Sequence, residues 1–256
     1  MTWFTFYPSR IPLFAVVHAL FWLPVMYLVA VSYDHVQPVV PYVSNFGIYP
    51  PEKYMFMSSM ILYGMLICLL FTSAIISQWF WCFMMRKKFE RKSWSTIGQR
   101  LSILTGLIFT ASGICIVILS FIDTKNDNET HYYLAMLNFI CHAIAIPLGT
   151  VLVAGVFQPW VWFCFSRVLI SIQMILGSYF FVYFNEAGLL VEEAEDFFYI
   201  KRHEPGYEEF KWSAVSEWFV IIGCIEITLI IGLELRNYEK QYVYEDKKVL
   251  KLCRSN

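Results

Sequence analysis

Long apolar runs alternate with short polar segments along the whole chain, and this alternation decides the fold class. An α-helix needs about 20 apolar residues to cross a bilayer, and each run reaches that length. We therefore expect an all-α integral membrane protein with six transmembrane helices in one bundle, over residues 11–32, 54–83, 101–122, 132–157, 162–184 and 213–235. Residues 236–256 alternate basic with acidic side chains and are expected to form a charged, loosely ordered tail.

Composition supports this fold class and excludes several others. Hydrophobic residues make up 58% of the chain and charged residues only 15%, whereas soluble domains carry about 25% charged residues. No basic patch is interleaved with aromatic residues, so we expect no nucleic-acid partner. The seven cysteines show no CxxC spacing, and the sequence therefore predicts neither a zinc site nor a disulfide framework.

The distribution of basic residues predicts the orientation of the bundle. Six spans place 14 of the 19 Lys and Arg residues on the same side as the N-terminus, and basic residues gather on the cytosolic side of membrane proteins. Both termini, and the tail at 236–256, are therefore expected in the cytosol. The sequon Asn128-Glu129-Thr130 falls on the opposite side, where Asn128 is a predicted glycosylation acceptor.

The segment between the first two runs, residues 38–56, is rich in proline and cannot be a regular helix. Polar residues within the spans are the other candidates for function, because burying them costs free energy. Together these features predict a pocket that opens on the non-cytosolic side, lined by Asn138, His142, Glu217, Pro51 and Glu52. Two alternatives stay open: the loop only connects two helices, and Asn138 and His142, four residues apart on one helix face, only bridge helices.

Three further polar groups lie within the spans. Glu226 falls near the middle of the sixth run and requires a partner, protonation or a water-filled cavity; a channel or transporter would use such a residue. His18 lies inside the first run. Arg167 lies near the start of the fifth run, where its long side chain is expected to reach the membrane interface.

A dense basic segment follows the second run. It fits the rule that basic loops face the cytosol, and it also predicts attraction to anionic lipid head groups at the cytosolic face. A cytosolic protein partner is a further expectation for this segment and the tail. The residues predicted to contact anionic lipid are Arg86, Lys87, Lys88, Arg91 and Lys92.

Sequence motifs do not favour an enzyme. The chain has no HExxH, no GxSxG, no Walker loop and no dinucleotide fingerprint. We therefore assign no catalytic residue, no metal ligand and no cofactor.

Two short motifs resemble signatures of the DRAM family, the damage-regulated autophagy modulators. The loop VPYVSNFGIYPPEK is similar to the family pattern P-Y-I-S-x-x-G-x-x-P-P-E, and it keeps Pro41, Tyr42, Ser44, Gly47, Pro51 and Glu52. Before the last run, PGY followed by SAVSEW resembles P-G-Y … S-A-x-S-E-W. One departure is Glu234-Leu235-Arg236, where DRAM-type proteins commonly have an aromatic-plus-acidic pair.

The resemblance implies one of three kinds of membrane protein. The wider Frag, DRAM and Sfk group includes lysosomal autophagy modulators, plasma-membrane proteins that help to recruit a phosphatidylinositol 4-kinase, and Golgi or ER factors for GPI-anchor lipid remodelling. The two motifs lie nearer the DRAM and Sfk side. We expect a non-enzymatic regulator or adaptor of the endolysosomal or plasma membrane, with GPI-anchor remodelling in the Golgi or ER as the alternative.

Overall fold

The computed structural model describes residues 7, 9–37, 39–89, 92–154, 161–189 and 205–254, without the side chains of 71–89, 92–95, 189, 238 and 241–254. The described residues form six α-helices and one short 3-10 helix, and none of them is in a strand. In chain order the elements are α1 (Arg10–Ser32), η1 (Val43–Gly47), α2 (Glu52–Phe89), α3 (Lys92–Leu119), α4 (Asn128–Leu152), α5 (Val161–Leu189) and α6 (Tyr207–Arg254).

Each of the six α-helices contains a segment long and apolar enough to cross a membrane, so the chain is a multi-pass membrane protein. The prediction of an all-α fold with six membrane helices is confirmed. Large apolar side chains such as Phe14, Leu107 and Val151 are more than half exposed on the outside of the bundle, which suits a surface that faces lipid.

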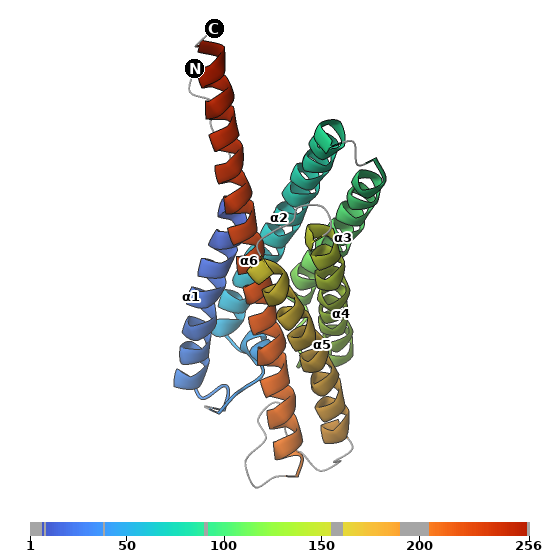
Figure 1. Ribbon diagram of the computed structural model, residues 1–256. Coiled ribbons are helices and arrows are strands. Elements are labelled where there is room, and N and C mark those ends of the chain that lie inside the picture. The colour runs from blue at the N-terminus through green and yellow to red at the C-terminus, as the bar shows by residue number, and fades with distance from the viewer. Residues whose placement is uncertain are drawn as a thin grey trace.

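Helices that follow one another in the chain pack side by side, and α6 returns to contact α1, which closes a ring (Figure 1). The interior of the ring is filled by buried side chains such as Ile67, Phe109, Ile146, Met174 and Val220. The loop between α1 and α2 lies at one end of the bundle, and the start of α1 and the end of α6 lie at the other (Figure 1). These are called the first-loop end and the terminal end below.

α2 and α3 pack closely, and two glycines permit the approach. A Cβ atom added at Gly64 would lie 2.7 Å from the carbonyl oxygen of Gly113, and one added at Gly113 would lie 2.7 Å from Cys68 Sγ. Small residues let helix backbones approach closely in membranes, where packing contacts drive association. The two glycines therefore set the spacing between α2 and α3.

The last helix differs from the sequence prediction. The sixth helix is predicted to end at Leu235 and residues 236–256 to be loosely ordered, whereas α6 continues to Arg254. Residues 236–254 contain neither proline nor glycine, so nothing local interrupts the helix. The carboxylate of Glu239 also accepts hydrogen bonds from the backbone N–H and the hydroxyl of Ser9, at 2.8 and 2.6 Å, and so ties the extension to the start of α1.

Arg167 is buried between α5 and α6 rather than extended along the surface of the bundle. Its guanidinium donates two hydrogen bonds to the carboxylate of Glu234 on α6, from Nε to Oε1 at 2.8 Å and from Nη2 to Oε2 at 2.5 Å. Both side chains are at least 95% buried. A buried arginine requires a partner with matching geometry, and only the packing of α5 on α6 brings the carboxylate to it.

Candidate functional site

The first loop folds back into the bundle instead of projecting from it. Its 3-10 helix η1 buries Val43, Asn45 and Phe46. The ring of Phe46 packs edge-on against that of Trp218, with the centroids 6.3 Å apart, and Trp218 Nε1 donates a hydrogen bond of 2.8 Å to the carbonyl oxygen of Pro41. The loop is therefore an internal wall of the first-loop end.

Glu217, one residue before Trp218, binds the start of η1. Its Oε2 accepts a hydrogen bond of 2.6 Å from the backbone N–H of Val43, and Ser44 donates to the same carboxylate from its hydroxyl and its backbone. The first N–H groups of a helical turn have no partner within the turn and favour a carboxylate. The SEW segment therefore accepts hydrogen bonds from the PYVS segment, so the two motifs identified in the sequence contact each other.

Two residues predicted for the pocket, Pro51 and Glu52, do not line the bundle interior. The side chain of Glu52, at the start of α2, is completely buried, and its Oε1 lies within hydrogen-bond distance of His35 Nδ1, at 2.5 Å. Pro51 is exposed. α2 begins at Glu52, and neither Pro51 nor Glu52 lines the cavity described below.

Asn138 and His142 join α4 to α3. Ser112 on α3 donates a hydrogen bond of 2.6 Å to Asn138 Oδ1. His142 Nδ1 lies 3.0 Å from the carbonyl oxygen of Asn138 and 3.1 Å from Ser112 Oγ, so Nδ1 carries the proton and donates. His142 is 99% buried and packs edge-on against Phe109. This arrangement is the helix-bridging alternative for His142, whereas Asn138 also faces the bundle interior.

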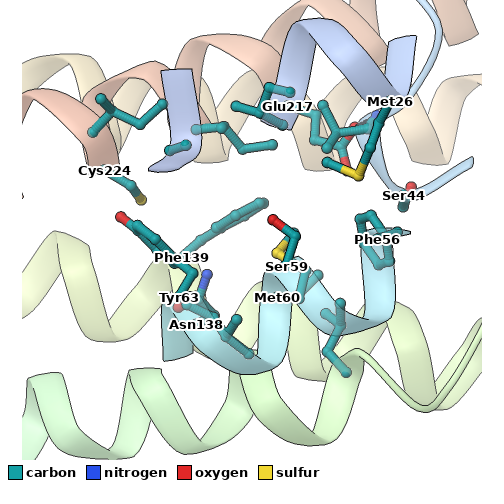
Figure 2. A pocket seen from close by; sticks show the side chains of 18 of the residues that line it. Met26, Ser44, Phe56, Ser59, Met60, Tyr63, Asn138, Phe139, Glu217 and Cys224 are labelled. Carbon is teal, nitrogen blue, oxygen red and sulfur yellow. Dashed lines mark hydrogen bonds between the residues drawn. The ribbon is translucent and has the colours of Figure 1, made fainter. Parts of the chain in front are cut away.

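A cavity lies inside the first-loop end of the ring, between α1, α2, α3, α4, α6 and η1 (Figure 2). It offers about 100 Å³ to the centres of water-sized molecules. Most of its lining is apolar, for example Leu23, Met26, Phe56, Ile116 and Phe139. The side chains with polar atoms that line this first-loop cavity are His18, Ser44, Ser59, Tyr63, His131, Asn138, Glu217 and Cys224.

The predicted pocket and the observed cavity therefore share only part of their residues. Asn138 and Glu217 line the cavity, whereas His142, Pro51 and Glu52 lie elsewhere. Sequence reasoning did not identify Ser59, on α2, or His131, near the start of α4, as lining residues. Membrane helices contain many serines at helix contacts, so Ser59 carried no signal by its residue type alone.

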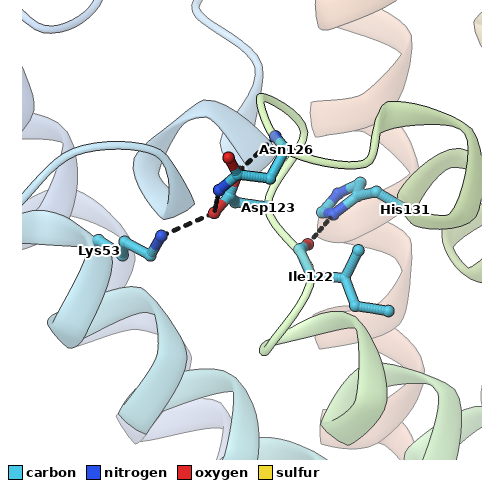
Figure 3. A network of polar contacts seen from close by, with 5 residues as sticks. All are labelled: Lys53, Ile122, Asp123, Asn126 and His131. Carbon is cyan, nitrogen blue, oxygen red and sulfur yellow. Dashed lines mark hydrogen bonds and ion pairs between the residues drawn. The ribbon is translucent and has the colours of Figure 1, made fainter.

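A polar cluster closes the same end of the bundle next to the cavity (Figure 3). Lys53 Nζ lies 2.6 Å from Asp123 Oδ2, and Asn126 donates to Asp123 from its backbone and its side-chain amide. Burial tends to raise the pKa of Asp123, but the hydrogen bonds from Lys53 and Asn126 outweigh burial and hold that pKa below its usual range. His131 Nδ1 donates a short hydrogen bond of 2.5 Å to the carbonyl oxygen of Ile122.

The remaining predicted sites lie apart from this cavity. Glu226 is half-buried on α6 and makes no hydrogen bond or ion pair with the residues that the structure describes. Asn128 is exposed in the first turn of α4, where Asp127 caps the helix by accepting the N–H of Thr130. Of the basic segment, Arg91 lies outside the described residues, and the described residues Arg86, Lys87, Lys88 and Lys92 have helical backbones without described side chains.

No group of three or more His, Cys, Asp or Glu side chains within the described ranges is placed to hold a metal ion.

Comparison with known proteins adds one finding. A family model described as the Frag1/DRAM/Sfk1/Cwh43P N-terminal domain matches residues 8–238. Neither the curated proteins nor the solved structures compared with the chain include a match. The matched range covers all six membrane segments and ends just after the last of them.

Proposed function

Because this chain belongs to the Frag1/DRAM/Sfk1/Cwh43P family, we propose that it is a non-enzymatic regulator or adaptor that joins its membrane to a cytosolic protein partner. DRAM-type autophagy modulators and the Sfk-type proteins that recruit a phosphoinositide kinase are its expected functional relatives. The endolysosomal system or the plasma membrane is the proposed compartment.

The extension of α6 is the observation that carries this proposal. Beyond the membrane segment that ends at Asn237, the helix continues to Arg254, which adds about 25 Å at about 1.5 Å per residue. In Figure 1 this arm projects past the other helices at the terminal end, the end to which α2 also runs. The sequence of the arm carries Lys247, Lys248 and Lys251 beside Glu245 and Asp246. A charged helical arm and a basic segment at the same end of the bundle offer surfaces for a protein partner and for anionic lipid.

The polar groups of the membrane region support a regulator over an enzyme. The carboxylate of Glu217 binds the backbone of η1, His142 binds Asn138 and Ser112, and Arg167 binds Glu234. A catalytic acid, base or nucleophile has to reach its substrate. Each of these side chains instead joins two parts of the protein.

Rescue of a knockout cell line tests the proposal. The native chain is compared with a chain that ends at Lys240 and with a chain in which Arg86, Lys87 and Lys88 are each replaced by Glu. Lys125→Glu, an exposed change at the first-loop end, is the matched charge control. Autophagosome turnover and plasma-membrane phosphatidylinositol 4-phosphate are measured together with the location of each tagged chain.

The knockout is expected to lower autophagosome turnover or plasma-membrane phosphatidylinositol 4-phosphate. We expect the native chain and Lys125→Glu to restore whichever of the two is lowered. The truncated and charge-reversed chains should reach the same membrane and restore it poorly. Full rescue by both altered chains would contradict the proposal.

GPI-anchor lipid remodelling in the Golgi or ER is the second candidate, and the first-loop cavity favours it because a lipid chain can enter such a space. Surface levels of GPI-anchored proteins in the same knockout separate the two. A Golgi or ER location with reduced surface GPI-anchored proteins would support remodelling. A lysosomal or plasma-membrane location with unchanged levels would support the regulator.

A further inference from the structure

We propose that the first-loop cavity binds one membrane lipid with a hydrocarbon body and a small uncharged head made of hydroxyl or amide groups. A sterol and a ceramide share this chemistry. The inference goes beyond the proposed function, which rests on the terminal end of the bundle, and it depends on a different set of residues.

The size and walls of the cavity point to a hydrocarbon body. About 100 Å³ is open to the centres of water-sized molecules, whereas a single water needs only about 10–15 Å³ by the same measure. Side chains such as Met26, Met60 and Ile221 line it, and methionine adapts its shape to an irregular apolar guest. The cavity lies between membrane segments at the first-loop end, where membrane lipid is the abundant source of hydrocarbon.

Two polar groups in the lining lack part of their hydrogen bonding. His18 is 94% buried, and its Nε2 lies 3.3 Å from Ser59 Oγ, but its Nδ1 has no hydrogen-bond partner among the described residues. The side-chain oxygen of Asn138 is taken by Ser112, while its amide nitrogen points toward the cavity (Figure 2). A buried polar atom without a partner is costly. A ligand hydroxyl or amide could accept from Asn138 or donate to His18 in this otherwise apolar space.

The charge of the lining argues against a phosphate group. The described residues that line the cavity include no lysine or arginine. The acidic lining residue, Glu217, has its carboxylate occupied by donors from Val43 and Ser44. A phosphate would meet that carboxylate without a basic partner, and an unpaired buried charge is strongly unfavourable. The polar group of the ligand is therefore uncharged.

Photochemical cross-linking tests this assignment. The purified full chain is reconstituted in phosphatidylcholine vesicles that contain a photoactivatable sterol, a photoactivatable ceramide or a phosphatidylcholine with a photoactivatable acyl chain. After illumination, the labelled peptides are mapped by mass spectrometry. We expect saturable labelling by the sterol or the ceramide on cavity-lining stretches such as 18–26, 56–63 and 135–139. The probe that labels these stretches more strongly identifies which of the two lipids binds.

Variants that fill the cavity test whether the labelled lipid lies inside it. Ala135 lines the cavity and is buried, whereas Ala111 is exposed on α3 outside it. Ala135→Leu is expected to lower labelling by about ten-fold, the effect of displacing about two methylene groups, and Ala111→Leu is expected to leave it unchanged. Thermal melting verifies that each variant is folded, and Ile221→Phe serves as a second filling variant.

Three results would overturn the proposal. The first is equal labelling of the cavity stretches by phosphatidylcholine and by both uncharged lipids. The second is labelling confined to the outside of the bundle, a result that is measured on the native chain and needs no variant. The third is undiminished labelling in a folded filling variant.

Discussion

The carboxylate of Glu217 is buried within a membrane segment and is held there by backbone donors from the first loop. Val43 and Ser44 supply these donors, and neighbouring Trp218 binds Pro41. Individual polar contacts are worth most where no water can replace them. At the scale of single residues, the stability of the first-loop end therefore depends on a few hydrogen bonds between distant parts of the chain.

Replacing Glu217 by alanine is expected to destabilise the protein by about 1–3 kcal/mol, because the N–H of Val43 stays buried without an acceptor. Glu217→Gln keeps one acceptor oxygen and should cost less. Thermal melting in detergent, followed by tryptophan fluorescence, measures both. Glu226→Ala, on the same helix but without a partner among the described residues, is the control, and an equal loss of stability in that variant would argue against the role of Glu217.

The buried pair of Arg167 and Glu234 predicts a marked difference between single and double variants. Arg167→Met or Glu234→Leu alone leaves an uncompensated buried charge and should cost about 3–5 kcal/mol. The double variant removes both charges and should recover most of that loss. A double-mutant cycle of melting temperatures measures the coupling; additive losses would show that the pair contributes no coupling energy.

Asp123 predicts how the first-loop end responds to acid. Since its pKa is lowered in the folded chain, its contribution to stability is fully present above the ordinary carboxyl pKa of about 3.9 and is lost as the pH falls through the lower folded value. The melting temperature of the native chain should fall more between pH 6 and pH 3 than that of Asp123→Asn. Glu129→Gln, at an exposed position, should behave like the native chain.

At the scale of whole helices, the α2–α3 pair depends on backbone proximity rather than on large interlocking side chains. Gly64 and Gly113 face each other at the crossing, and Ser112, beside Gly113, reaches across to α4. α3 is thereby fixed on two sides. The first-loop cavity forms in part because α4 packs on α3 and α5 and makes few contacts with α6.

Gly113→Leu is expected to separate α2 from α3, since the added side chain would overlap Cys68 and the backbone of Gly64. We expect a lower yield of monodisperse protein in size-exclusion chromatography and a lower melting temperature. Ala111→Leu, two residues earlier and exposed, makes a comparable addition toward lipid and should leave both measurements unchanged. Similar behaviour of the two variants would contradict the close approach.

For the molecule as a whole, the bundle has two unlike ends. The first-loop end is closed by η1 and by the contacts of Lys53 with Asp123, and it carries the sequon at Asn128. The terminal end carries the start of α1 and the long α6 arm (Figure 1). The excess of lysine and arginine on the terminal side predicts that this side faces the cytosol.

Thiol labelling of sealed vesicles tests this orientation. With vesicles whose cytosolic face is outside, a membrane-impermeant maleimide should label the native Cys253, and replacement by serine should remove that label. A cysteine introduced at Asn126, exposed at the first-loop end, should be labelled only after the membrane is opened. The reverse pattern would invert the predicted topology.

The sequence by itself determined the fold class, the number of membrane helices and the family. These properties follow from run length, charge distribution and short motifs, all of which are local. It also identified Asn138 and Glu217 as polar residues whose burial requires an explanation. It could not determine that α6 extends to Arg254, because a charged tail without apolar periodicity gives no signal for a helix that is anchored at Glu239 by Ser9.

The tertiary structure alone decided which polar residues meet. Glu217 and Val43 are 174 positions apart, and Arg167 and Glu234 are 67 positions apart. No local pattern encodes such pairs, because the partner of a buried polar group depends on how helices rotate and pack. The same reason explains why His142 belongs to a helix contact and His18 to the cavity. Because the contact of α1 with α6 closes the ring, residues from five helices and η1 surround one cavity.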